Sequence, residues 1–249
     1  MSLKNQHHLS PSQGLIRKDI AILTIINMNK LSLLQLLRIC SPTLPIGSYA
    51  YSQGLETACH NEYVTDQESL NKWIKGVLKN SLEYLDIPIF SRLYDAHLDQ
   101  NNEKIRYWND YILASRETNE LLLEDTQMGK ALARLLFDLG LEESIYWKKN
   151  PCSLLTTFSL ACAKWEIEKN TATQGLIWSW CENQVGIGVK LIPLGQTSGQ
   201  LILSDLMQCI NDCATSGLLI ENDLIGATCP GAVMASMQHE QQYTRLFRS

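Results

Sequence analysis

Apolar residues recur every three or four positions along most of this chain, a spacing typical of helices that bury one face. The clearest run follows the stretch Thr65-Asp66-Gln67-Glu68, which has the form of a capping box with Thr65 and Glu68 as its two members. Its apolar positions are Leu70, Trp73, Ile74, Val77, Leu78, Leu82 and Leu85. We therefore expect a helix here.

The same spacing predicts helices on both sides of this run. One begins at Leu31 and stops before Pro42, and another spans 88–98 with Pro88 in its first turn. A long helical region covers 103–139, with a break near Thr118 or Asp125. Three further helices are expected near 153–168, 171–191 and 195–217.

Alternating apolar and polar runs are nearly absent, and no Asn-Gly or Asp-Gly hairpin signal occurs. The sequence therefore predicts a single all-α domain with no significant β-sheet. We expect residues 1–27 to be a poorly ordered N-terminal extension, with Met28 an alternative start to Met1. The helical domain would span 28–234, and residues 235–249 would form a C-terminal tail.

Charge and cysteine placement narrow the class of protein. The 249 residues carry a net charge of -5, so no positive field attracts nucleic acid, and no apolar run is long enough to span a membrane. The eight cysteines are scattered without a Cys-x-x-Cys pair, which favours reduced thiols and a cytoplasmic location.

Catalytic and metal-binding motifs are missing or incomplete. Gly129-Lys130 lacks the remaining residues of a phosphate-binding loop, and neither a zinc-protease nor a serine-hydrolase motif occurs. Cys209 with Cys213, and Cys59 with His60, offer too few ligands for a metal site. Composition alone leaves two alternatives open, a metal-dependent hydrolase with Cys and His ligands and an all-α ligand-binding regulator.

Three acidic residues lie at helical spacing in the middle of the chain. Glu117, Glu120 and Glu124 would form a carboxylate stripe on one helix face, with Arg116 offsetting part of the repulsion. The stripe is either a solvated surface or a surface that docks a partner or steers a cation.

Four ordered blocks of the sequence resemble the UreF-type urease accessory proteins. The blocks are SPTLPIGSYAYSQGLE at 41–56, RETNELLLEDTQMGKAL at 116–132, VKLIPLGQTSGQLIL at 189–203 and ASMQHEQQYTRLFRS at 235–249. The resemblance runs from Leu31 to Ser249 and has no counterpart for residues 1–27. Ser48-Tyr49 stand where many relatives carry other small and aromatic residues.

This resemblance implies a non-catalytic all-α homodimer. Such a protein would assemble with a UreD/UreH-type accessory protein and a UreG-type GTPase to deliver nickel to apo-urease. It would hold no cofactor tightly, and nickel would only pass through it. Neither nucleic acid nor a membrane would be a partner.

Within the matching blocks we expect surfaces for these partners. In the first block the candidates are Tyr49, Tyr51, Gln53 and Glu56, because tyrosines on a rigid loop are good interface anchors. In the third block they are Lys190 and Gln196, and we hypothesise that Lys190 contacts the GTPase.

The last block combines aromatic, apolar and arginine side chains in an otherwise acidic protein, which is typical of a docking peptide that orders on binding its partner. Its candidates are His239, Glu240, Tyr243, Arg245, Leu246, Phe247 and Arg248. Glu117, Glu120 and Glu124 remain weak candidates for a nickel path.

Overall fold

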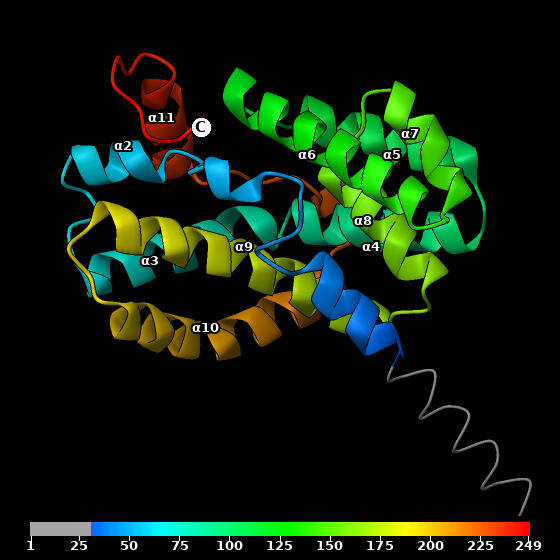
Figure 1. Cartoon of the computed structure of the whole chain (residues 1–249), viewed down its shortest axis with the longest axis horizontal. Coiled ribbons are helices and arrows are strands. Elements are labelled where there is room, and N and C mark those ends of the chain that lie inside the picture. Colours follow the sequence, from blue (N-terminus) through cyan, green and yellow to red (C-terminus); the bar gives the residue numbers. More distant parts are fainter. Residues whose placement is uncertain (1–30) are drawn as a thin grey trace, which may run out of the picture.

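A computed structural model describes residues 31–249, and within that range the chain forms helices joined by short loops, with no strand (Figure 1). Residues 31–39 are helical. The α-helices that follow are α2 (Leu55–His60), α3 (Gln67–Val77), α4 (Asp86–Leu98), α5 (Asn102–Ala114), α6 (Asn119–Asp138), α7 (Ile145–Lys149), α8 (Leu154–Lys164), α9 (Lys169–Leu191), α10 (Gln196–Gly217) and α11 (Pro230–His239). The all-α prediction is confirmed, and the expectations for residues 1–27 and for Met28 lie outside the described range.

Short single-turn elements complete the chain. Ser48–Ala50, Glu142–Ser144 and Asn222–Leu224 are 3₁₀ turns, and the π-helical turn Leu78–Leu82 extends α3 toward α4. None of the described helices is long and apolar enough to cross a membrane.

Two apolar cores lie side by side and share two helices. One is built mainly from α4, α5, α6 and α8, and the other from α2, α3, α9 and α10. Helix α4 contributes Phe90 to the first core and Ile87 to the second. Helix α9 contributes Ala172 to the first core and Ile177 to the second. Figure 1 shows the two groups of helices at opposite ends of the molecule, joined through α4 and α9. The two ends therefore form one folded unit.

Local capping explains where the central helices begin. Asp66, not Thr65, is the N-cap of α3: its carboxylate accepts a bond from the Ser69 amide at 2.8 Å, and the Ser69 hydroxyl accepts one from the Asp66 amide at 3.0 Å. The predicted capping box is thus displaced by one residue, because an Asp side chain reaches the third amide as readily as Thr does.

The long region 103–139 breaks at Thr118, one of the two predicted positions. Helix α5 ends at Ala114, and the Thr118 hydroxyl caps α6 by accepting a bond from the Leu121 amide at 3.2 Å. The three later helices are also found, as α8, α9 and α10.

Gly54 allows α11 to lie directly against the start of α2. Its φ of 81° belongs to the left-handed region, and a Cβ at this position would be 2.6 Å from the Ser236 backbone nitrogen. Glycine is therefore required twice over, by its backbone conformation and by the close approach of α11. This contact brings the end of the chain to α2.

Candidate functional site at the C-terminal segment

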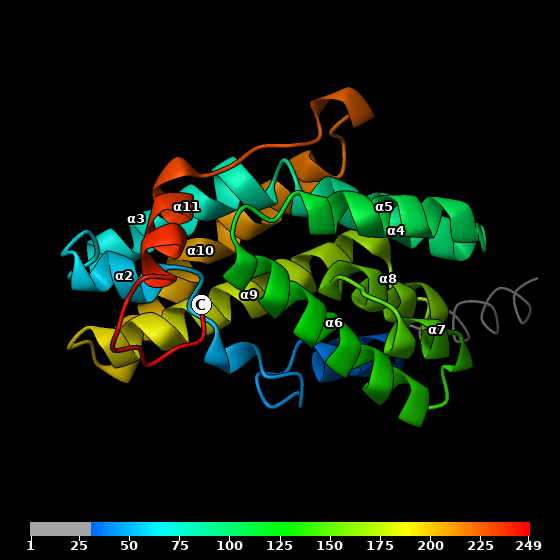
Figure 2. The same ribbon diagram turned by 90° about the horizontal axis from the view of Figure 1, so that it is seen from above.

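Residues 240–249, here called the C-terminal segment, fold back from α11 to lie between α2 and the start of α6 (Figure 2). The Arg248 amide donates to the Ala50 carbonyl at 2.8 Å, and the Ser52 amide donates to the backbone oxygen of Ser249 at 2.6 Å. Ser249 is fully buried. In this structure the segment thus packs against its own chain, and the expectation that it orders on binding a partner stays a prediction.

His239, the last residue of α11, is buried between two carboxylates. Its Nδ1 lies 2.7 Å from Glu120 Oε2 on α6, and its Nε2 lies 3.2 Å from Glu56 Oε2 on α2. A carboxylate accepts hydrogen bonds, so each ring nitrogen that carries a hydrogen donates to the Glu side chain that it faces. His239 therefore ties α11 to α2 and α6 at once.

The same two carboxylates hold the C-terminal segment. Glu56 accepts bonds from the Leu246 amide at 2.7 Å and the Phe247 amide at 2.9 Å, while Glu120 pairs with the Arg245 guanidinium. Glu240 accepts a bond from the Glu120 amide at 3.2 Å. Charge-assisted bonds of this kind are the stronger ones in proteins, so the segment has a defined path over the surface.

This path turns apolar side chains outward. Tyr243 is fully exposed, Leu246 is 77% exposed, and Phe247 is half-buried against the second core. The backbone of the segment is thus held while one aromatic and one aliphatic side chain face solvent. Exposed side chains of this kind are typical of the residues that anchor a protein interface.

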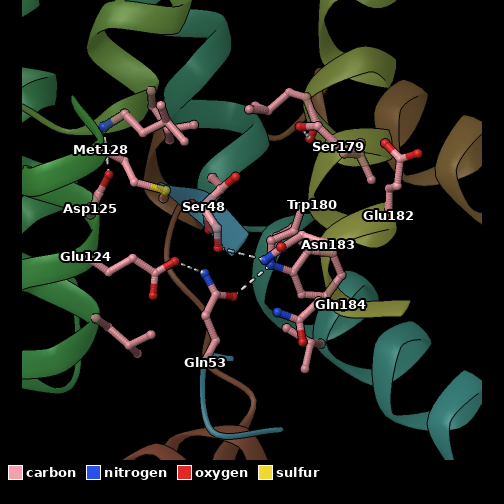
Figure 3. Close-up of a pocket in the computed structure, with 18 of the residues that line it drawn as sticks. Ser48, Gln53, Glu124, Asp125, Met128, Ser179, Trp180, Glu182, Asn183 and Gln184 are labelled. Atoms are coloured by element: carbon pink, nitrogen blue, oxygen red, sulfur yellow. Dashed lines mark hydrogen bonds between the residues drawn. The ribbon is translucent and has the colours of Figure 1, made fainter. Parts of the chain in front are cut away.

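Behind the segment lies a cavity of about 310 Å³, here called the central cavity, between α6 and α9 (Figure 3). Gln53 crosses it: its Nε2 donates to Glu124 Oε1 at 2.7 Å, and its Oε1 accepts from Trp180 Nε1 at 2.7 Å. The Ser249 hydroxyl donates to the other Glu124 oxygen at 2.8 Å. Gln184, also in the lining, is 1% exposed, and its Nε2 has no hydrogen-bond partner among residues 31–249.

Burial raises the pKa of Glu124 to about 7, although the bonds from Gln53 and Ser249 favour its charged form. The unfolded chain loses this proton near pH 4.5. Between these values the folded state binds the additional proton, so the stability supplied by Glu124 falls as the pH rises from 4.5 toward 7.

Glu124→Gln is expected to remove this slope, because glutamine keeps an acceptor for Gln53 and cannot ionise. The unfolding free energy of the wild type should fall relative to that of the variant by roughly 1–3 kcal/mol between pH 4.5 and 7.5. Urea unfolding at both pH values measures this, with the exposed Glu117→Gln as a control. Parallel pH profiles of wild type and Glu124→Gln would show that Glu124 ionises normally.

Arg116 joins three helices beneath the site. Its guanidinium donates to Asp86 at the start of α4 and to Asp125 on α6, both at 2.9 Å. Asp125 also accepts bonds from the Ser153 hydroxyl and from the Leu154 amide, and it thereby caps the start of α8. Burial raises the pKa of Asp86, and the attraction of Arg116 offsets part of that rise. Arg116 therefore pairs with Asp86 and Asp125, whereas the sequence predicted that it offsets the glutamate stripe.

The predicted stripe of three glutamates does not form. Glu117 precedes the N-cap of α6, is exposed, and accepts a bond from Thr228 at 2.7 Å. Glu120 faces His239 and Arg245, whereas Glu124 is buried in the central cavity lining. The stripe is wrong because the helix begins only at Asn119. Two of the three carboxylates instead hold the end of the chain.

The two tyrosines in the loop before α2 differ in exposure. Tyr49 is exposed, whereas Tyr51 is buried and its hydroxyl donates to Gln127 at 2.5 Å. In this structure Tyr51 therefore holds the loop in place and is not accessible to a partner. Lys190 and Gln196 are exposed on either side of the connection between α9 and α10. Within residues 31–249 neither of these two forms a hydrogen bond to the C-terminal segment.

Metal ligands do not gather in the described part of the chain: no three His, Cys, Asp or Glu side chains there could hold an ion. The two nitrogens of His239 face different carboxylates, so the ring and its partners do not converge on one point. Cys209 and Cys213 are buried with their sulfurs 4.0 Å apart, and both pack in the second core as small apolar residues.

Sequence reasoning missed Asp86, Asp125, Trp180 and Gln184 as parts of the site. Asp86 and Trp180 are far in sequence from the residues they bond, and no motif marks them. Asp125 lies within the second matching block, but nothing in that block assigns it to Arg116. Gln53, Glu56 and His239 were predicted from the family resemblance as partner contacts. In the structure their side chains bond within the chain, Glu56 with His239 and Gln53 with Glu124. A buried charged or amide residue has no sequence signal beyond interrupting an apolar face.

Comparison with known proteins identifies the family. The UreF family model matches residues 64–207. The urease accessory protein UreF of Hahella chejuensis is 43% identical over 222 residues, which are 89% of this chain and 100% of the relative. The corresponding protein of Alkalilimnicola ehrlichii is 42% identical over 216 residues, 86% of this chain and 95% of the relative. This chain therefore belongs to the UreF family of urease accessory proteins.

Proposed function

We propose that this protein is a non-catalytic scaffold for urease maturation. In this proposal it acts in the cytoplasm as a homodimer, assembles with a UreD/UreH-type accessory protein and a UreG-type GTPase, and delivers nickel to apo-urease. Family membership supports the urease role. The observation that carries the scaffold role is the C-terminal segment, whose backbone is held by the buried carboxylate of Glu56 while Tyr243 and Leu246 face outward.

The C-terminal segment is the proposed docking surface for the UreD/UreH-type partner. Tyr243 and Leu246 supply apolar area to a partner, and the exposed Arg248 supplies a cation. Aromatic and arginine side chains dominate the energetics of protein interfaces. An anchored segment also costs less entropy on binding than a frayed tail would.

Nickel is proposed to pass through this protein without a resident site. The lining of the central cavity includes carboxylates together with amide groups such as Gln184; the carboxylates are Asp86, Glu117, Glu124, Asp125 and Glu182. Within residues 31–249 no three of them are placed to hold one ion, and such an arrangement binds a divalent cation weakly, which suits passage and not storage. Lys190 lines the same cavity and is exposed, and we propose that it contacts the GTPase.

Truncation after Gln242 is expected to abolish the complex with the UreD/UreH-type partner while the helical fold is kept. Co-expression followed by gel filtration measures the complex, and circular dichroism measures the fold. Because truncation also removes internal bonds, a second variant combines Tyr243→Ser with Leu246→Ser, which changes only exposed side chains. We expect at least about 30-fold weaker partner binding, the equivalent of about 2 kcal/mol.

The matched control combines Leu98→Ser with Tyr107→Ser, which removes one exposed aliphatic and one exposed aromatic residue from α4 and α5. This control is expected to bind the partner normally. Undiminished partner binding by both C-terminal variants would refute the assignment of the docking surface.

A further inference from the structure

A second hollow, here called the basic hollow, lies beside the C-terminal segment and has a volume of about 340 Å³. Its wall is formed by the loop 46–51, the outer face of α6 and the end of the C-terminal segment. Three cationic side chains line it: Lys130 and Arg134 from α6, and Arg248. Two parts of the chain that are distant in sequence thus bring their positive charges to one concave surface.

The three cations of the basic hollow have no anionic partner in the described structure. Within residues 31–249 no carboxylate forms an ion pair with Lys130, Arg134 or Arg248. Lys130 and Arg134 also stand four residues apart on one helix, an arrangement that destabilises a helix by a few tenths of a kcal/mol. In a chain of net charge -5, an uncompensated group of three cations in a hollow indicates a site for an anion.

The position of Arg248 depends on the docking of the C-terminal segment. Its amide donates to the Ala50 carbonyl at 2.8 Å, and the next residue, Ser249, is buried. If the segment left this position, the hollow would lose one of its three cations. An anion bound by Lys130, Arg134 and Arg248 together would therefore also hold the segment in place, since a ligand stabilises the state that binds it.

We propose that the basic hollow binds a phosphate-type dianion, free or carried by a small molecule, and that this binding stabilises the docked C-terminal segment. A single carboxylate would leave two of the three positive charges uncompensated, whereas a dianion leaves one. Arginine presents paired N–H groups that match the oxygens of a phosphate. The volume of the hollow is at the lower end of the range for small-ligand pockets, about 300–1,000 Å³.

Isothermal titration of the full chain with inorganic phosphate tests this proposal, with acetate at matched ionic strength as the monoanion. We expect saturable phosphate binding at one site per chain and at least tenfold weaker binding of acetate. Adenosine monophosphate forms a second arm: tighter binding than phosphate indicates a phosphate carried by a small molecule, and weaker binding indicates free phosphate. Absence of saturable binding in both arms would overturn the proposal.

The variant Lys130→Ala with Arg134→Ala is expected to bind phosphate at least tenfold more weakly. Both side chains lie on the outer face of α6, where alanine supports the helix. The control, Lys104→Ala with Arg106→Ala, removes one exposed lysine and one exposed arginine from α5 and should bind like the wild type. Equal loss in both variants would show that only the overall charge matters, which would also overturn the proposal.

A second readout follows the C-terminal segment itself. Saturating phosphate is expected to slow hydrogen exchange of the Leu246 and Phe247 amides in the wild type but not in Lys130→Ala with Arg134→Ala. Exchange rates that phosphate leaves unchanged in the wild type would refute the link to the segment. No urease is needed, so the outcome is independent of the proposed function.

Discussion

Arg116→Met is expected to lower the free energy of unfolding by about 3–5 kcal/mol, the usual cost of removing one partner from a buried charge network. Asp86 and Asp125 would lose the guanidinium that now lies 2.9 Å from each. The start of α4, the middle of α6 and the cap of α8 all depend on this one side chain.

Urea unfolding monitored by circular dichroism measures this effect. Arg106→Met, on the exposed face of α5, serves as the control and should change stability by less than about 0.5 kcal/mol. Adding Asp86→Asn to Arg116→Met should recover part of the loss, because one unpaired buried charge is removed. A loss below about 1 kcal/mol in Arg116→Met would contradict the role given to this network.

Glu56→Ala is expected to release the C-terminal segment without unfolding the helices. The change removes the acceptor of the Leu246 and Phe247 amides and one of the two carboxylates that flank His239. Each hydrogen bond to a charged group contributes about 1.5–3 kcal/mol, so the loss of two such bonds strongly weakens the attachment of this short segment.

Limited digestion with trypsin measures the release, because the backbone at the exposed Arg245 and Arg248 fits the protease active site only when the segment detaches. We expect cleavage at Arg245 to be at least tenfold faster in Glu56→Ala than in the wild type. Glu117→Ala is the matched control, since Glu117 is exposed and bonds only to Thr228 among the described residues. Equal cleavage rates in the three proteins would show that Glu56 does not hold the segment.

The helices were predictable from sequence because periodic burial and capping are local properties. Leu70, Ile74 and Leu78 lie where the spacing requires, and Thr118 breaks the long region by capping α6. The same local reasoning misplaced the N-cap of α3 by one residue, since Thr65 and Asp66 are both good caps.

The site was less predictable, because its contacts join residues far apart in the chain. Glu56 and His239 are 183 positions apart, and neither residue carries a local motif for the other. The glutamate stripe failed for a related reason: helical spacing gives the face on which a residue lies, but not where the helix starts or what packs against it. Family resemblance identified most of the residues, whereas only the structure gave their arrangement.

Under the proposed function, this protein delivers nickel to urease and needs its C-terminal segment for that work. The direct measurement is the nickel content and specific activity of urease purified from a strain lacking this gene, complemented with the wild type or with Arg245→Ala. We predict nickel-free urease in the deletion strain, full loading with the wild type, and poor loading with Arg245→Ala. Fully loaded urease without this protein would contradict the claim.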